Sequence, residues 1–131
     1  GVTKKIRFGN FQPGSAEDMN ALDPEITHLL AGKLAIWDAS GVEDSHMGVF
    51  SNLEVIEGKF QIKGVNITHL DAFDKLMTVN GNIDMLDNTS LTDFCGLKNL
   101  FSTGTVPDNF TFTITGNASN PAKQEIIDNC N

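Results

Sequence analysis

The chain repeats itself with a period of about 23 to 26 residues, and this repeat constrains the fold more than any other feature. Residues 53–62 match residues 76–85 position by position, and residues 67–76 match residues 91–100. Residues 30–36 carry the tail of the same pattern one step earlier. A single unit of this length cannot bury its apolar edge alone, so the repeat predicts a stack of similar units.

The repeated unit reads apolar-Thr-x-apolar-x-x-apolar-x-x-Leu-x-x-apolar-x-Gly-x-apolar-x-apolar. Apolar residues spaced three apart predict a compact irregular or 3₁₀ segment. The Gly predicts a tight turn, and the alternating pair after it predicts a strand with one buried face. We therefore expect an open parallel sheet to which each unit contributes one short strand.

The N-terminal end departs from the unit and is expected to cap the stack. Residues 6–8 predict a first short strand. Residues 15–22 predict a capping helix with Ser15 as its N-cap and Asp18 three residues further on, and Pro24 ends it.

The C-terminal end departs in the same way, because the pattern slips after Leu100. Residues 110–114 alternate and predict the last strand, and residues 121–127 predict a closing helical turn. At 131 residues the chain fits one domain. Its expected parts are an N-terminal cap with the first strand at 1–31, repeats at 32–114 and a C-terminal cap at 115–131.

The recurring apolar positions predict one continuous core. Its expected members are Leu34, Ile36, Leu53, Ile56, Phe60, Ile62, Phe73, Leu76, Val79, Ile83, Met85, Leu97, Leu100, Phe110 and Phe112.

The charge of the chain excludes two classes of partner. The 17 acidic and 9 basic residues give a net charge of −8, the wrong sign for binding phosphates or an anionic lipid surface. No stretch approaches the roughly 18 apolar residues of a membrane span. We expect neither nucleic-acid binding nor membrane insertion.

The strings NLEVIEGKFQI (52–62), ITHLDAFDKLMTVNGNIDM (67–85) and LTDFCGLKNL (91–100) resemble the receptor L domain and the related leucine-rich-repeat surface proteins of gut Bacteroidetes. The resemblance implies an α/β leucine-rich-repeat-like solenoid of the receptor L-domain type, with right-handed coils, a short parallel sheet and few helices. It also implies a non-catalytic binding or adhesion module that meets a protein or glycan. The alternative is a structural or assembly component of a larger cell-surface complex.

The same resemblance implies an extracellular or bacterial cell-surface location. The chain starts at Gly1 with no initiating Met, and we expect an export signal to have been removed.

The sequence favours no catalytic function. It contains no Gly-x-Ser-x-Gly elbow, no phosphate-binding Gly-rich loop and no His-Glu-x-x-His motif. Adjacent acids such as Glu43 and Asp44 are expected to be solvated surface charges. We expect neither an enzyme nor a cofactor.

His46, His69 and Asp93 occupy the same position in three successive units. Stacking would align them in a column that could bind zinc, since two imidazoles and a carboxylate suit that metal. The preferred interpretation is a solvated turn position that holds no metal.

Two alternatives are left open for Cys95 and Cys130, the only cysteines. A bridge would hold the last segment of the chain against the stack, whereas two free thiols would suit an organism that uses few disulfides.

Four Asn-x-Ser/Thr motifs, which begin at Asn66, Asn88, Asn109 and Asn117, have the form of glycosylation acceptors. Asn and Thr are also common in turns, and the bacterial resemblance favours this second interpretation.

The alternation of the strands predicts a binding surface. With Leu34 and Ile36 facing inward, Ala35 and Trp37 must face outward. An outward Trp beside polar side chains would be a candidate contact residue. The preferred interpretation is that the N-terminal segment around Phe11 folds over Trp37 and buries it. The candidate ligand contacts are Trp37, Gln61, Lys63, Asp84, Thr111 and Thr113.

Overall fold

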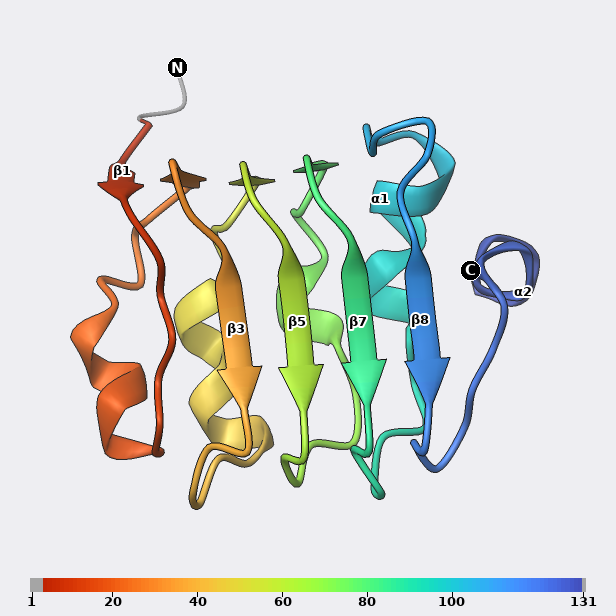
Figure 1. Ribbon diagram of the computed structural model, residues 1–131, viewed down its shortest axis with the longest axis horizontal. Coiled ribbons are helices and arrows are strands. Elements are labelled where there is room, and N and C mark those ends of the chain that lie inside the picture. Colours follow the sequence, from red (N-terminus) through yellow and green to blue (C-terminus); the bar gives the residue numbers. More distant parts are fainter. Residues whose placement is uncertain (1–3, 131) are drawn as a thin grey trace.

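Eight short strands form two parallel sheets in residues 4–130, the part of the chain that the computed structural model describes. The first sheet has the order β1 (Ile6–Phe8), β2 (His28–Leu30), β4 (Val55–Ile56) and β6 (Thr78–Val79). The second has the order β3 (Leu34–Trp37), β5 (Phe60–Lys63), β7 (Ile83–Leu86) and β8 (Phe112–Thr115). Figure 1 shows the four strands of the second sheet side by side.

The register of the second sheet has the spacing of the sequence repeat. Leu34 lies opposite Phe60, and Phe60 lies opposite Ile83, at separations of 26 and 23 residues. Ile83 lies opposite Phe112 because the last unit is longer. In the units of β2 and β3, β4 and β5, and β6 and β7, the chain therefore adds one strand to each sheet. The last unit adds only β8, to the second sheet.

The first sheet was not expected from the sequence. We predicted irregular structure where β4 and β6 form, and these strands have only two residues each. Two residues are too few to show an alternating pattern, so the apolar spacing of three dominates the sequence signal.

The helical segments connect the strands and are short. Those with 3₁₀ geometry are η1 (Glu17–Ala21), η2 (Asp44–Phe50), η3 (Asp71–Phe73) and η4 (Cys95–Leu97), followed by the α-helices α1 (Lys98–Ser102) and α2 (Lys123–Asn129). In Figure 1, η2, η3 and α1 lie behind the second sheet, so they cover its inner face. Among residues 4–130 no helix is long and apolar enough to cross a membrane.

The predicted core is buried except at its C-terminal end, where Phe110 and Phe112 are only half-buried. Phe110 precedes β8, and the register places Phe112 and Ile114 at the inward positions opposite Ile83 and Met85. The inward residues of the last strand are therefore Phe112 and Ile114, two residues later than the predicted pair Phe110 and Phe112. β8 is the last strand of its sheet, so no further strand covers these side chains.

The repeated glycines lie at bends, as predicted, but close packing rather than left-handed backbone requires them. The φ angles of Gly32, Gly58 and Gly81 lie outside the left-handed region, but a Cβ atom on Gly58 would lie 2.5 Å from the carbonyl oxygen of Gly32. A Cβ on Gly81 would lie 2.8 Å from the backbone nitrogen of Lys59. These glycines allow neighbouring units to approach closely.

Left-handed backbone occurs instead directly after each strand of the second sheet. Asp38, Gly64, Asp87 and Gly116 take φ angles of 52°, 67°, 54° and 73°. Asp and Gly tolerate this region better than most residues do, which explains their recurrence at this position.

The N-terminal cap agrees with the sequence in its residues but differs in its geometry. β1 forms as predicted at residues 6–8. The capping segment is a 3₁₀ helix that begins at Glu17, two residues after the predicted N-cap. Ser15 Oγ accepts a hydrogen bond from the Asp18 N–H (3.2 Å), and Asp18 Oδ2 accepts one from the Gly14 N–H (3.0 Å).

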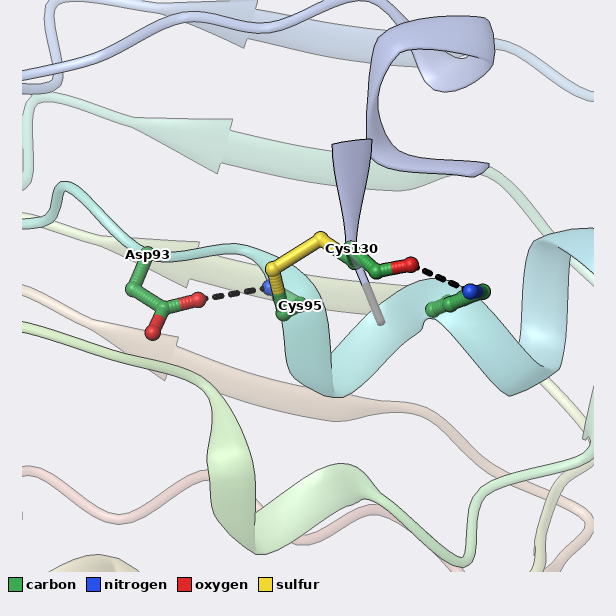
Figure 2. The surroundings of a disulfide bond; sticks show 4 residues. Asp93, Cys95 and Cys130 are labelled. Carbon is green, nitrogen blue, oxygen red and sulfur yellow. Dashed lines mark hydrogen bonds between the residues drawn. A yellow bond between two sulfur atoms is a disulfide. The ribbon is translucent and has the colours of Figure 1, made fainter. Parts of the chain in front are cut away.

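A disulfide between Cys95 and Cys130 holds the C-terminal cap, so of the two alternatives the bridge is the one that forms. Figure 2 shows it beside two hydrogen bonds. Asp93 Oδ1 accepts one from the Cys95 N–H (2.8 Å), and Lys98 Nζ donates the other to the carbonyl oxygen of Cys130. These contacts attach the end of α2 to η4 and α1.

Candidate functional site

The outward side chains of β3, β5, β7 and β8 form one surface, here called the outer face. The strand register aligns them in two rows. The first row is Ala35, Gln61, Asp84 and Thr113, and the second is Trp37, Lys63, Leu86 and Thr115. Five of the six predicted contact residues lie in these rows. The sixth, Thr111, precedes β8 and donates its N–H to Asn82 Oδ1 at 2.9 Å.

Trp37 is exposed on the outer face, with 42% of its surface accessible. The Nζ of Lys63 lies 5.0 Å from the centre of its ring and 3.5 Å from Asp38 Oδ2. This cation–π contact and the ion pair hold the indole next to β5.

The interpretation that the segment around Phe11 buries Trp37 is wrong. Phe11 pairs with Leu34, whose side chain faces the core, and is itself 4% exposed. Its ring packs against Phe50 at a centroid distance of 6.2 Å. Phe11 therefore points inward and leaves the outer face of β3 open.

A shallow hollow opens beside Trp37 on the outer face. Its lining residues are Gln12, Lys33, Ala35, Trp37 and Gln61. Ala35 is the smallest side chain of its row, so the depression lies between the longer side chains around it. The lining combines an aromatic ring, two amides and an ammonium group, a set that can contact both apolar and hydroxylated ligands.

Gln61 is held at the edge of this hollow. Its Nε2 donates a hydrogen bond of 2.8 Å to Asp84 Oδ2 on the neighbouring strand. The carboxylate therefore positions the Gln61 amide, and Thr113 lies opposite Asp84 on the far side.

Sequence reasoning missed Gln12 and Lys33, which line the hollow. A signal was present, because Gly-Lys precedes an apolar strand residue at both Gly32-Lys33 and Gly58-Lys59. Lys33 and Lys59 precede the inward residues Leu34 and Phe60, so the alternation directs them outward.

The alternative of a zinc-binding column of His46, His69 and Asp93 has no support in the geometry of these side chains. The Nδ1 atom of His46 accepts the Glu43 N–H (3.0 Å), and that of His69 accepts the Asp71 N–H (3.3 Å). Asp93 likewise accepts the Cys95 N–H. Each of these side chains therefore accepts a backbone N–H at the start of a 3₁₀ segment. Within residues 4–130 no three His, Cys, Asp or Glu side chains are grouped to hold a metal ion.

Two of the four Asn-x-Ser/Thr motifs begin at buried residues. Asn88 and Asn117 are buried and hydrogen-bonded to the backbone and to each other, whereas Asn66 and Asn109 are exposed. In the folded protein only the second pair is open to a modifying enzyme.

No protein-family model matches this chain, and neither a curated protein nor a solved structure matches it. The outer face is therefore interpreted from its own chemistry.

Proposed function

We propose that this protein is a non-catalytic binding module that presents the outer face to a protein or glycan, on a leucine-rich-repeat-like solenoid of the receptor L-domain type. The parallel register at the repeat spacing supports the fold assignment. So do the strings Ile83-x-Met85-x-x-Asn88 and Phe112-x-Ile114-x-x-Asn117, which have the spacing of a leucine-rich repeat.

The observation that carries the proposal is the exposure of Trp37 beside the hollow. Tryptophan is enriched among the residues that dominate binding energy, and its large ring loses little conformational entropy on contact. Lys63 further restricts the ring in the unbound protein. A ligand would therefore meet an anchor that is already positioned.

An extracellular or bacterial cell-surface location fits this proposal. The Cys95–Cys130 disulfide supports it, because such bonds form and persist mainly in oxidising compartments.

An assembly role is the second candidate, and the first sheet favours it. Ile6 and Phe8 on the edge strand β1 are 44% and 71% exposed. An apolar edge strand can pair with another chain and extend the sheet.

Binding of the purified protein to immobilised oligosaccharides and peptides separates the two candidates. We expect Trp37→Ala to weaken the strongest interaction by about tenfold or more. Phe8→Ala is the matched control, since it removes an exposed aromatic ring from the other sheet. If Trp37→Ala retains all binding and Phe8→Ala abolishes self-association in sedimentation, the assembly role replaces the binding role.

A further inference from the structure

Lys33 and Lys59 are neighbours at the start of β3 and β5. The Leu34 N–H donates to the carbonyl oxygen of Lys59 at 3.0 Å, which fixes the two backbones side by side. Like charges at adjacent positions of paired strands destabilise each other. Among residues 4–130 neither ammonium group forms an ion pair with a carboxylate.

The acidic side chains of the same face are engaged elsewhere. Asp38 pairs with Lys63, and Asp84 accepts the hydrogen bond of Gln61. The Lys33–Lys59 pair is thus a local positive site on a chain whose net charge is −8. An anion placed between the two ammonium groups would relieve their repulsion.

The hollow, which is lined by Lys33 and not by Lys59, suits a ring with several hydroxyl groups. Trp37 and Ala35 offer apolar contact, and the amides of Gln12 and Gln61 can both donate and accept hydrogen bonds. A peptide would bind best by pairing with a strand edge, but β3 pairs with Phe11 on one side and β5 on the other. β5 is likewise enclosed by β3 and β7.

We propose that this hollow binds an acidic sugar, a pyranose ring that carries a carboxylate. The carboxylate lies between Lys33 and Lys59, the ring packs on Trp37, and the hydroxyl groups bond to Gln12 and Gln61. The inference rests on the proposed function and names its ligand class.

Trp37 is the only tryptophan, so its emission reports directly on the hollow. The experiment titrates tetragalacturonate and sialyllactose into the full chain, each beside its uncharged methyl ester, and repeats the titrations by calorimetry. We expect at least one acid to bind about tenfold more tightly than its ester, because charge-assisted hydrogen bonds are the stronger ones. The difference should shrink as salt is raised.

The variant Lys33→Ala/Lys59→Ala should bind the acid no more tightly than the ester. Lys4→Ala/Lys75→Ala is the matched control, since it removes the same charge away from the hollow and should keep the preference. The Nζ of Lys75 donates to Asn52 Oδ1 at 3.2 Å, and neither residue lines the hollow.

Three results would overturn the acidic-sugar inference: no binding of either acid, equal binding of acid and ester, or unchanged preference in Lys33→Ala/Lys59→Ala. An oligoglutamate peptide that binds in place of both sugars would overturn it as well. The proposed function survives any of these results if some ligand of the immobilised panel still depends on Trp37. If no ligand of the panel depends on Trp37, both the proposed function and the acidic-sugar inference fail.

Discussion

The side-chain oxygen of Asn117 accepts hydrogen bonds from both the backbone N–H and the side-chain amide of Asn88, each at 3.0 Å. Asn88 repeats this arrangement one unit earlier, since its oxygen accepts the Val65 N–H and its amide donates to the carbonyl oxygen of Ile62, both at 3.1 Å. Asn117 donates to the equivalent carbonyl, that of Met85, at 2.8 Å. The two buried amides therefore connect successive units of the repeat.

Replacing Asn88 by Ala should destabilise the fold by about 2–4 kcal/mol. The change leaves the Val65 N–H and the Ile62 carbonyl without their partner, and each buried unsatisfied group costs about 1–3 kcal/mol. Urea unfolding followed by circular dichroism measures the loss. Asn109→Ala is the exposed control and should change stability by less than about 0.5 kcal/mol. Equal effects of the two substitutions would contradict the proposed role of Asn88.

Gly58→Ala should destabilise the protein by about 1–3 kcal/mol, because the new methyl group would overlap the Gly32 carbonyl of the neighbouring unit. Gly48 in η2 is the matched control, since a Cβ there meets nothing within 4 Å. Gly48→Ala should be neutral or slightly stabilising, as it lowers the entropy of the unfolded chain. Thermal unfolding of both variants tests this contrast, and a stable Gly58→Ala protein would show that neighbouring units can separate without cost.

The offset between residues 53–62 and 76–85 predicted the pairing of Phe60 with Ile83 without any structural information. It could do so because inward apolar side chains must recur at every unit to fill a shared core. The same logic placed Gln61 and Asp84 on the outer face.

Other features follow from contacts that no single unit contains. Asn88 looks like a turn residue until Ile62 and Val65 of the preceding unit lie against it. Lys33 and Lys59 become neighbours only because the Leu34 N–H of one unit donates to the Lys59 carbonyl oxygen of the next. Burial of a polar group and adjacency of two charges depend on the relative position of units, which an apolar pattern does not specify.

Loss of the Cys95–Cys130 disulfide should lower the free energy of unfolding by about 3–4 kcal/mol. The bridge closes a loop across 35 residues, and its main effect is to restrict the unfolded chain. Cys95→Ser/Cys130→Ser should unfold at the same urea concentration as the reduced wild-type protein, and reductant should not affect the variant. A thiol assay of the unreduced wild type should detect no free thiol, and two reactive thiols would contradict the bridge.

Asp44 should make stability depend on acidic pH. Desolvation raises the pKa of this carboxyl, but hydrogen bonds from the Thr68 hydroxyl (2.6 Å) and N–H (2.9 Å) outweigh it, and the pKa lies below its usual value. The stabilisation is therefore present above the unfolded-state pKa of about 3.9 and is lost as pH falls through the lower native value.

The variant Asp44→Asn tests this direction of the pH dependence. Its free energy of unfolding should be lower than that of the wild type at pH 6. This gap between the two proteins should narrow between pH 4 and pH 2 as the wild-type carboxyl becomes protonated. Asp108→Asn, a change at an exposed turn residue, should leave the gap near zero at every pH. A gap for Asp44→Asn that stays constant across this range would assign its effect to packing rather than to charge.

The emission of Trp37 should be red-shifted and strongly quenched by acrylamide in the folded protein, because 42% of its surface is accessible. The Lys63 ammonium lies over the ring, so Lys63→Ala should increase quenching further while it changes stability by no more than about 1 kcal/mol. Phe11→Leu is the control, since it alters the core below β3 and should leave the quenching constant unchanged. Shielded, blue-shifted emission in the wild type would mean that the indole is covered. The outer face would then lack the anchor on which both the proposed function and the acidic-sugar site depend.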